Sequence, residues 1–557
     1  MSDRFRTDMS TGYGWDEPSI VLGSPLLADA VYPDVRIRIP LSRVNRHGLI
    51  AGATGTGKTK TLQVLAEQLA AAGVPVFAVD VKGDLSGVGA PGDATNSRVI
   101  ERSASLGWTF TPAGNTIELL SLSGTVGAHV RASVSSFGPL LLGKVLDLNE
   151  TQTSILSLVF RYCDDENLPL LDLADLRTTL KFLASDEGKP VLEDLGGISK
   201  ASLGVILRSI VTLEQEGADV FFGEPEFDVD DLLRTTPEGR GVVSLLEVAD
   251  VMDRPRLYST FVLWMLAQLY EALPEVGDVP KPRLAFFFDE AHLLFDDASE
   301  ALMEQIERTA RLIRSKGVGV YFVTQAPTDV PPSVLSQLGN RIQHALRAFT
   351  PDDADALRKT ARTFPVTDHY DVERTITSLG IGEALVTVLG PNGVPTPLAA
   401  TRLVPPASRM APLTDVEQKE RTIASTFAAK YGKAVDRESA HEIITERLLN
   451  ARAAAAVAAG EGSLRDTVSP TTADGLGGMT PSQQRREVER RARELERARR
   501  EAERERKARE RELAADERRR AKTMETSIRT AGRVMTSKAG QSILRGVFDT
   551  IFGGGRR

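Results

Sequence analysis

Apolar residues recur along roughly the first 400 positions with two periods, one typical of strands and one typical of helices. Between residues 35 and 41 every second side chain is apolar, which predicts a half-buried strand. A short, mostly apolar run at 47–51 leads into a glycine-rich loop, and the spacing of apolar residues from 58 to 72 predicts a helix that Gly73 ends. A second apolar run follows at 74–80. The order strand, loop, helix, strand is typical of a βαβ unit.

Helical patterns fill the region from about 125 to 235 and separate the first strands from the later ones. The amphipathic stretches predict helices at 140–148, 151–162, 171–183 and 199–216. Strand-like runs resume at 241–246, 284–289, 318–324 and 342–349, with helices expected at 255–273 and 299–316. We therefore expect an α/β core at 46–405 that carries a helical insertion, preceded by an N-terminal strand segment at 1–45.

The regular alternation ends near Pro405 and Pro406, which mark a domain boundary. The composition then predicts a helical extension at 406–459, a flexible linker at 460–481, a charged helix at 482–522 and an amphipathic segment at 523–557. Apolar residues are too scarce in the charged helix to sustain a heptad, so a single solvated helix is favoured over a coiled coil. The amphipathic end could dock on the body, on a partner or on a membrane surface, and docking on protein is the default.

The composition of the 557 residues, 41% hydrophobic and 26% charged, is typical of a soluble globular protein. The single cysteine, Cys163, excludes an intramolecular disulfide and indicates a reducing compartment. Residues 1–10 lack the apolar centre of a signal peptide, and the longest apolar runs, such as 261–269, are about half as long as a membrane span. We therefore expect a cytoplasmic protein without stable membrane insertion. The net charge of −8 argues against a uniformly basic coat for nucleic acid but allows a local basic channel.

The loop of the βαβ unit carries the pattern G-x-x-x-x-G-K-T. The residues expected to bind ATP are Gly52, Ala53, Thr54, Gly55, Thr56, Gly57, Lys58, Thr59 and Lys60. Glycines let backbone N–H groups turn toward phosphate oxygens, and the helix N-terminus adds partial positive charge. We expect Lys58 to contact the β- and γ-phosphates as a catalytic residue, and the Thr59 hydroxyl to ligate Mg²⁺. A fortuitous glycine-rich turn is the alternative.

The apolar run that begins at Leu284 ends in two carboxylates, Asp289 and Glu290. We expect Asp289 to hold Mg²⁺ and Glu290 to act as the catalytic residue that polarises the attacking water. Gln325 follows the next apolar run, and we expect its amide to contact the γ-phosphate or to position that water. The alternatives are two solvated acids and an amide that makes an ordinary hydrogen bond at a strand end.

Asp80, Lys82, Gly83 and Asp84 follow the first helix and its strand. They are expected at the same edge of the sheet as the acid pair, where ligands bind in open α/β folds. A structural role in a loop, or a contact between subunits, is equally open. We expect His292 to contact Glu290 and not to bind a metal, since no spacing of Cys and His indicates a metal site.

Several stretches together resemble HerA-like ATPases of the HerA/FtsK superfamily, and more closely a bacterial branch described by a helicase HerA-like C-terminal domain. They are residues 45–51, the run Asp80-Val81-Lys82-Gly83-Asp84-Leu85, residues 288–292 and 323–325, and the runs at 138–142, 148–152 and 341–347. The resemblance covers about residues 20–405 and returns in the glycine-rich C-terminal end. It implies an α/β fold with a RecA-like core of the additional-strand P-loop type, followed by a mostly helical tail.

The resemblance also implies homo-hexameric rings, ATP and Mg²⁺ at subunit interfaces, and translocation of DNA. A neighbouring subunit usually supplies an arginine to such a site, and Arg341 and Arg347 are the catalytic candidates here, with surface ion pairs as the alternative. Two departures from the better-known relatives stand out. The stretch before the glycine-rich loop is too short for the β-barrel of archaeal HerA, and the chain shows neither the membrane spans nor a clear winged helix of FtsK-like proteins.

We therefore expect an ATP-hydrolysing motor, most simply an oligomeric DNA translocase or helicase. The alternative is an ATP-dependent switch or scaffold that assembles through its C-terminal tail without acting on DNA, and a weaker one is a peripheral membrane ATPase that uses residues 543–552. Basic residues recur along one predicted helix and could line a channel or form a solvated face. They are Arg308, Arg311, Arg314 and Lys316.

Overall fold

The computed structural model describes residues 2–194, 196, 199–251, 255–295, 300–390 and 392–465. Met1–Ala456 forms one compact unit, which contains the whole predicted α/β core. The charged helix predicted at 482–522 and the amphipathic segment predicted at 523–557 lie outside the described residues, as does most of the linker predicted at 460–481.

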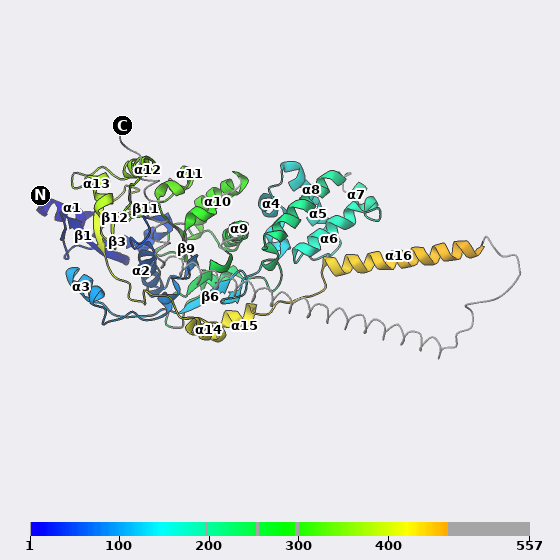
Figure 1. Ribbon diagram of the computed structural model, residues 1–557, viewed down its shortest axis with the longest axis horizontal. Coiled ribbons are helices and arrows are strands. Elements are labelled where there is room, and N and C mark those ends of the chain that lie inside the picture. The colour runs from blue at the N-terminus through cyan, green and yellow to red at the C-terminus, as the bar shows by residue number, and fades with distance from the viewer. Residues whose placement is uncertain are drawn as a thin grey trace, which may run out of the picture. The chain divides into compact units, whose positions relative to one another are not determined.

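A single mixed sheet runs through this unit (Figure 1). Its strands in the described residues are β1 (Ser19–Leu27), β2 (Ala30–Val31), β3 (Ile37–Pro40), β4 (Gly48–Ala51), β5 (Val76–Asp80), β6 (Ile117–Ser121), β7 (Ala128–His129), β8 (Val243–Glu247), β9 (Leu284–Phe288), β10 (Val318–Thr324), β11 (Asn340–Gln343), β12 (Glu383–Thr387) and β13 (Ala399–Leu403). They are ordered β2-β1-β13-β12-β11-β4-β10-β9-β5-β8-β6-β7, and β3 pairs with β1.

The strands from β11 to β7 in this order are all parallel. Within them, β10 lies between β4, which precedes the glycine-rich loop, and β9, which carries the acid pair. One strand inserted between these two is the arrangement expected for an additional-strand P-loop core, so the predicted fold class is confirmed. The same order brings the carboxyl ends of β4, β10, β9 and β5 together at one edge of the sheet.

Helices cover both faces of the sheet and form the insertion. Around the sheet lie α1 (Ser2–Tyr13), α2 (Lys58–Ala71), α3 (Ser97–Ser105), α9 (Pro255–Ala272), α10 (Glu300–Leu312), α11 (Pro332–Leu335), α12 (Pro351–Ala361) and α13 (Val372–Ser378). The insertion contains α4 (Val134–Val145), α5 (Glu150–Asp165), α6 (Leu173–Ala184), α7 (Lys189–Asp194) and α8 (Lys200–Gln215). The C-terminal extension contains α14 (Asp415–Ala424), α15 (Thr426–Tyr431) and α16 (Ala440–Arg465).

Alternate side chains of the parallel strands build two separate cores, as the period of a strand requires. On β9, Phe286 and Phe288 pack on the side of α9, whereas Ala285 and Phe287 pack on the side of α2. Both faces are therefore buried, which explains why the central strands have nearly continuous apolar sequences. The result is a three-layer core with α2 on one face and α9 with α10 on the other.

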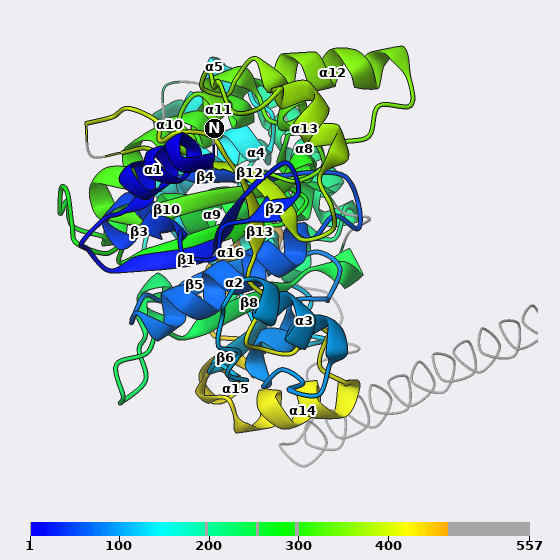
Figure 2. The ribbon, with the colours of Figure 1, turned by 90° about the vertical axis from the view of Figure 1, so that its left-hand side faces the viewer.

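The antiparallel end of the sheet goes beyond the sequence prediction. The strand predicted at 35–41 is β3, but β1 pairs with β13 at the far end of the core, with Gly23 opposite Leu403. Figure 2 views this end, where α1 lies beside β1 and β3. The Tyr13 hydroxyl at the end of α1 donates to the Val386 and Pro397 carbonyl oxygens, at 2.9 and 2.8 Å. The N-terminal segment is therefore part of the same sheet.

Other predicted elements have different limits, and the helix expected at 140–148, for example, is α4, which begins at Val134 and ends at Val145. The strand expected at 342–349 ends at Gln343, because the chain then leaves the sheet to pack under the glycine-rich loop. In the described residues, the helical extension predicted at 406–459 has three helices, of which α14 contacts β6 and α15 contacts β7. The last of them, α16, continues to Arg465, past the start of the predicted linker. In the part of the chain that is described, no helix is both long enough and apolar enough to cross a bilayer.

Candidate nucleotide site

The glycine-rich loop joins β4 to α2 at the carboxyl edge of the sheet. Gly52 has a φ of 156°, and a β-carbon at this position would lie 2.4 Å from the β-carbon of His344, so only glycine fits. Gly57, at φ 114°, is the residue before α2, and no side chain caps the helix there. The first backbone N–H groups of α2 therefore keep their capacity to bind an anion, as a phosphate-binding loop requires.

Lys58 lies inside the loop and is 8% exposed. Its Nζ donates to the carbonyl oxygens of Gly52, at 2.6 Å, and Ala53, at 3.2 Å. Burial lowers the pKa of Lys58, and the negative charge of Glu290 opposes that shift. An ammonium group that is held only by backbone carbonyls gains from a phosphate partner, because a charged acceptor makes a stronger hydrogen bond.

Asp289 directly follows β9 and is 3% exposed. Its Oδ2 has no hydrogen-bond partner, although a buried carboxylate oxygen without one is costly. Burial, and then the charge of Glu290, raise the pKa of Asp289 to about 7. A divalent cation would satisfy the orphaned oxygen and remove that destabilisation, so the residue fits its predicted role as a Mg²⁺ ligand.

Glu290 is the next residue and has a left-handed backbone, with φ 44° and ψ 51°. Its Oε1 forms an ion pair with Lys82 Nζ, and its Oε2 lies 3.4 Å from His292 Nδ1. Burial alone would raise the pKa of Glu290, but the hydrogen bond and charge of Lys82, with the charge of Lys58, hold it below its usual range. Glu290 is therefore an ionised carboxylate, the form that a general base needs.

The turn after β5 is built around the buried Asp80. Its carboxylate accepts hydrogen bonds from the N–H groups of Gly83, at 2.8 Å, Asp84, at 3.2 Å, and Leu85, at 2.7 Å. Gly83 has a φ of 70°, which few other residues adopt without strain. Burial raises the pKa of Asp80 to about 6 in spite of these bonds. Of the roles left open for this stretch, Asp80 has the structural one, and Lys82 reaches the acid pair.

Sequence reasoning missed Glu247 and left His344 without a role. Glu247 ends β8 opposite Asp80 in register, and its buried Oε1 has no hydrogen-bond partner. Burial, then the charge of Asp80, raise the pKa of Glu247 to about 8, so it is protonated at neutral pH. The signal was an acid directly after the apolar run at 241–246, the same signal that identified Asp289. His344 lies under the loop, with its Nε2 2.9 Å from Thr61 Oγ1, and burial lowers its pKa to about 3.

Three predicted residues lie at the rim of the site. Gln325 follows β10 and is exposed, between the glycine-rich loop on β4 and the acid pair on β9. Thr59 is half-buried at the start of α2. Lys60 Nζ donates to the Met410 carbonyl oxygen at 2.5 Å, so its side chain is engaged away from the loop, and its contact with ATP stays a prediction.

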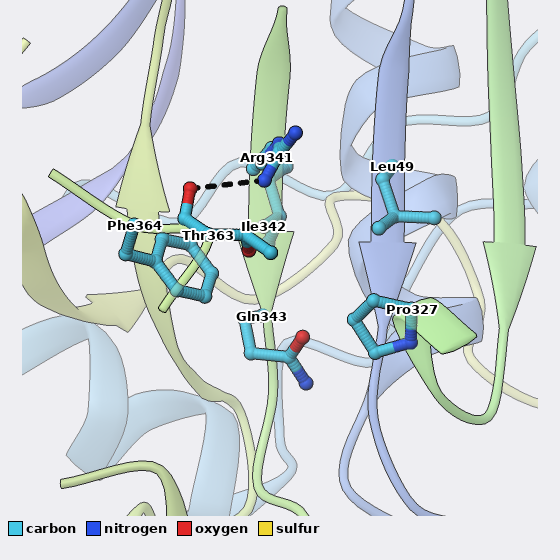
Figure 3. Close-up of a pocket in the computed structure, with 7 residues that line it drawn as sticks. All are labelled: Leu49, Pro327, Arg341, Ile342, Gln343, Thr363 and Phe364. Carbon is cyan, nitrogen blue, oxygen red and sulfur yellow. Dashed lines mark hydrogen bonds between the residues drawn. The ribbon is translucent and has the colours of Figure 1, made fainter. Parts of the chain in front are cut away.

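The two candidate arginines lie in different surroundings. Arg341, on β11, donates to the carbonyl oxygens of Leu335, Leu338 and Thr363 in its own chain, at 3.4, 3.4 and 3.1 Å. Figure 3 shows its bond to Thr363 at one wall of a recess next to β4 and β11. Arg347 lies beyond the end of β11 and is exposed. Action in a neighbouring site stays a prediction for both, and the exposed Arg347 is the better placed of the two.

The basic residues predicted along one helix lie on α10 and the turn after it. Arg308, Arg311 and Arg314 are exposed, whereas Lys316 Nζ lies 4.7 Å from the centre of the Tyr270 ring. Glu304 and Glu307 border the same hollow as Arg308 and Arg311. This surface therefore carries charges of both signs, and its role as a channel wall stays a hypothesis.

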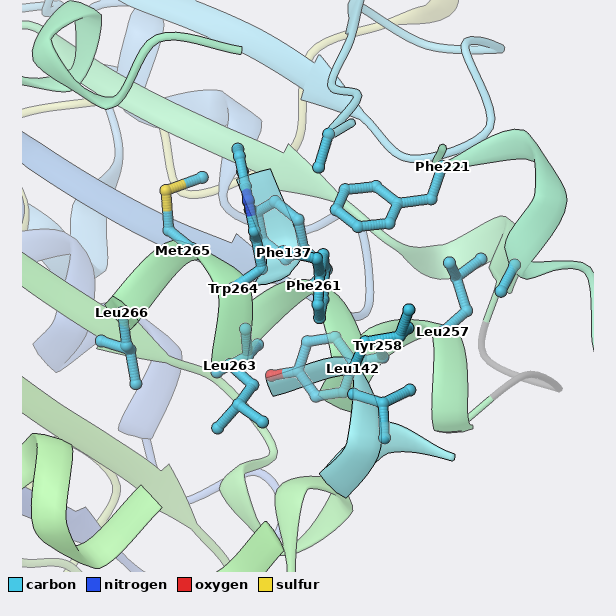
Figure 4. Close-up of a cluster of buried hydrophobic side chains, with 14 of the residues drawn as sticks. Phe137, Leu142, Phe221, Leu257, Tyr258, Phe261, Leu263, Trp264, Met265 and Leu266 are labelled. Atoms are coloured by element: carbon cyan, nitrogen blue, oxygen red, sulfur yellow. The ribbon is translucent and has the colours of Figure 1, made fainter. Parts of the chain in front are cut away.

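Helix α9 forms the wall behind the acid pair and joins the insertion to the core. Figure 4 shows its Tyr258, Phe261 and Trp264 packed with Phe137 of α4 and with Phe221. Trp264 Nε1 also donates to Ser136 Oγ at 3.2 Å. On the other side, the Phe261 ring lies 6.4 Å from that of Phe77 on β5, between their centres. Since the same helix contacts the insertion and the site strands, the insertion supports the edge on which Asp289 lies.

Comparison with known proteins gives one family. A family model described as helicase HerA-like C-terminal matches residues 27–557. Among curated proteins, the chain is similar to the DNA double-strand break repair helicase HerA of Sulfolobus acidocaldarius, at 21% identity over 65% of this chain and 66% of that protein. It is also similar to the protein of the same name from Pyrococcus furiosus, at 25% identity over 67% and 68% of the two chains. The chain spans about two thirds of the length of the curated relatives that it matches.

Solved structures show a partial likeness. The plasmid coupling protein TrwB in complex with ADP and Mg²⁺ is 15% identical and has a TM-score of 0.45, over 71% of this chain and 98% of that one. The VirB4 protein of Thermoanaerobacter pseudethanolicus is 14% identical and has a TM-score of 0.42, over 70% and 97% of the two chains.

Proposed function

The chain belongs to the helicase HerA-like C-terminal family of P-loop ATPases, and we propose that it hydrolyses ATP at the carboxyl edge of β4 and β9 and couples this reaction to movement along DNA. The observation that carries the proposal is the joining of three groups at one edge. They are the glycine-rich loop with its buried Lys58 before the uncapped helix α2, the carboxylate of Asp289 with its unpartnered Oδ2, and the ionised carboxylate of Glu290.

The residues of the site divide the chemistry among them. The loop N–H groups and Lys58 bind the phosphates of ATP, and Thr59 and Asp289 hold Mg²⁺, which supplies positive charge for the phosphate oxygens. Glu290 takes a proton from the attacking water as the water oxygen bonds to the γ-phosphorus. The bond from that phosphorus to the bridging oxygen breaks, and ADP and phosphate leave. Gln325, which follows the strand between β4 and β9, orients the water.

Assembly and DNA are the finer parts of the proposal. A ring of six copies would place an exposed arginine, Arg347, against the site of a neighbour, where it offsets charge on the transferred phosphate. The family description and the names of the two archaeal relatives, both DNA double-strand break repair helicases, support DNA as the substrate. The exposed arginines of α10 are the described surface that we assign to the DNA backbone.

Binding to duplex DNA tests this assignment. The wild-type protein with a slowly hydrolysed ATP analogue should bind a labelled duplex, measured by fluorescence anisotropy. If it neutralises about six phosphates, its affinity should fall by about 10³-fold between 50 and 200 mM salt. Mass measurement of the same sample should give six copies. An assembly that forms with nucleotide and binds no duplex even at low salt would contradict the proposal and favour the switch or scaffold.

A further inference from the structure

The ion pair between Lys82 and Glu290 connects the base of the reaction with the protein surface. The Lys82 side chain is 48% exposed, whereas that of Glu290 is 6% exposed. The pair therefore has one end inside the site and one end exposed to solvent. A second lysine, Lys58, already occupies the phosphate loop, so Lys82 is not needed to fill it.

The turn after β5 fixes this lysine close to the base. Asp80 accepts three backbone N–H groups of the turn, and the positive φ of Gly83 closes it. Strand β5 is the direct neighbour of β9, so the end of one strand presents Lys82 to the end of the other. Because the turn is held by a buried carboxylate, the lysine side chain is the part of the arrangement that can move.

The pair occupies one of the two carboxylate oxygens of Glu290, Oε1, whereas the buried Oε2 has no hydrogen-bond partner. The ammonium of Lys82 lies on Oε1 of Glu290, and Oε2 lies beside His292 Nδ1 at 3.4 Å. A carboxylate that accepts a hydrogen bond from an ammonium has fewer lone pairs for water, and its position is set by that bond. Glu290 is held in a resting arrangement while this contact lasts.

We propose that Lys82 is a positioning residue that restrains Glu290, and that a phosphate of the DNA backbone captures the exposed ammonium and frees the carboxylate for catalysis. Binding of DNA at the sheet edge then raises the rate of ATP hydrolysis through a single exchange of partners. A backbone phosphate is suited to the exchange, because it offers lysine the same charged oxygens as a carboxylate does. The inference rests on the proposed function, since it assigns the trigger for the same site.

Phosphate release by the full-length protein tests the inference, with saturating ATP and Mg²⁺, and with and without saturating duplex DNA. Lys82→Met should raise turnover without DNA by about tenfold, a part of the roughly 10²–10⁴-fold that a positioned base contributes, and leave little further stimulation. Lys82→Arg, which keeps the cation, should retain low basal turnover and stimulation by DNA. The KM for ATP should not change in either variant. Lys189→Met removes an exposed lysine of α7 that pairs with Glu193 at 4.0 Å, and it should behave as wild type.

Each other outcome overturns the inference in a distinct way. A Lys82→Met variant with lower turnover in both conditions, or with a higher KM for ATP, would assign Lys82 to the γ-phosphate of the nucleotide. Equal stimulation of the variant and of the wild type by DNA would show that the ion pair does not restrain the base. Failure of the proposed function gives a different result, because then the wild type itself shows no stimulation by DNA.

Discussion

Lys58→Ala is expected to abolish tight ATP binding and to reduce turnover by at least about 10²-fold, the usual scale for loss of a positioned charge at a reacting phosphate. The ammonium is buried within the loop and contacts only the Gly52 and Ala53 carbonyl oxygens among the described residues, so it is available to a phosphate. Titration with a fluorescent ATP analogue measures the binding, and phosphate release measures the turnover.

The same variant needs a folding control, because truncation leaves the Gly52 carbonyl oxygen without its donor, whereas the Ala53 carbonyl oxygen keeps the N–H and hydroxyl of Thr56. A buried orphan costs about 1–3 kcal/mol, which a core of this size should tolerate. Thermal unfolding should therefore still be cooperative, with a modestly lower midpoint. A folded Lys58→Ala protein that binds ATP as tightly as the wild type would contradict the assignment of the loop.

Glu290→Gln is expected to retain ATP binding and to lower turnover by about 10²–10⁴-fold, because the amide keeps the shape of the side chain but cannot take a proton from water. Binding is expected to persist, since the loop and Lys58 are unchanged. Rapid-quench measurement of a single turnover separates the chemical step from product release. The variant should then hold unhydrolysed ATP, which also makes it the suitable form for studying the assembly.

Glu247→Gln is the matched control for this substitution. Glu247 is a buried glutamate at the same edge, but its pKa of about 8 leaves it protonated at neutral pH, so an amide resembles the group already present. Its turnover should stay within a few-fold of the wild type on the same scale. Normal hydrolysis in Glu290→Gln, or an equal loss in both variants, would mean that the base is not Glu290.

The local parts of the site could be predicted from the sequence. A loop with glycines at these positions, followed by a helix, is typical of a phosphate-binding loop. An apolar strand that ends in two carboxylates, Asp289 and Glu290, indicates which edge of the sheet carries the site. The order of β4, β10 and β9 followed from the resemblance to a family and is confirmed. The glycine-rich loop and the acid pair depend on residues that are close in the sequence, where backbone geometry and apolar periodicity decide the structure.

The parts that the sequence did not predict depend on distant residues. The pairing of β1 with β13 joins Gly23 to Leu403, and no local pattern specifies such a partner. The three carbonyl oxygens that hold Arg341 are backbone groups, which any sequence offers. The contact of Lys82 with Glu290 exists because β5 and β9 are neighbours in the sheet, a fact of topology. Long-range packing therefore decided which charged residues meet.

The rate of phosphate release by the wild-type protein, with and without duplex DNA at low salt, tests the central claim most directly. From the proposed function we expect Mg²⁺-dependent hydrolysis of ATP that DNA accelerates, and the acceleration should fade as salt weakens contacts with the backbone phosphates. Hydrolysis at the same rate with and without DNA, in a protein shown to assemble and to bind ATP, would contradict the account.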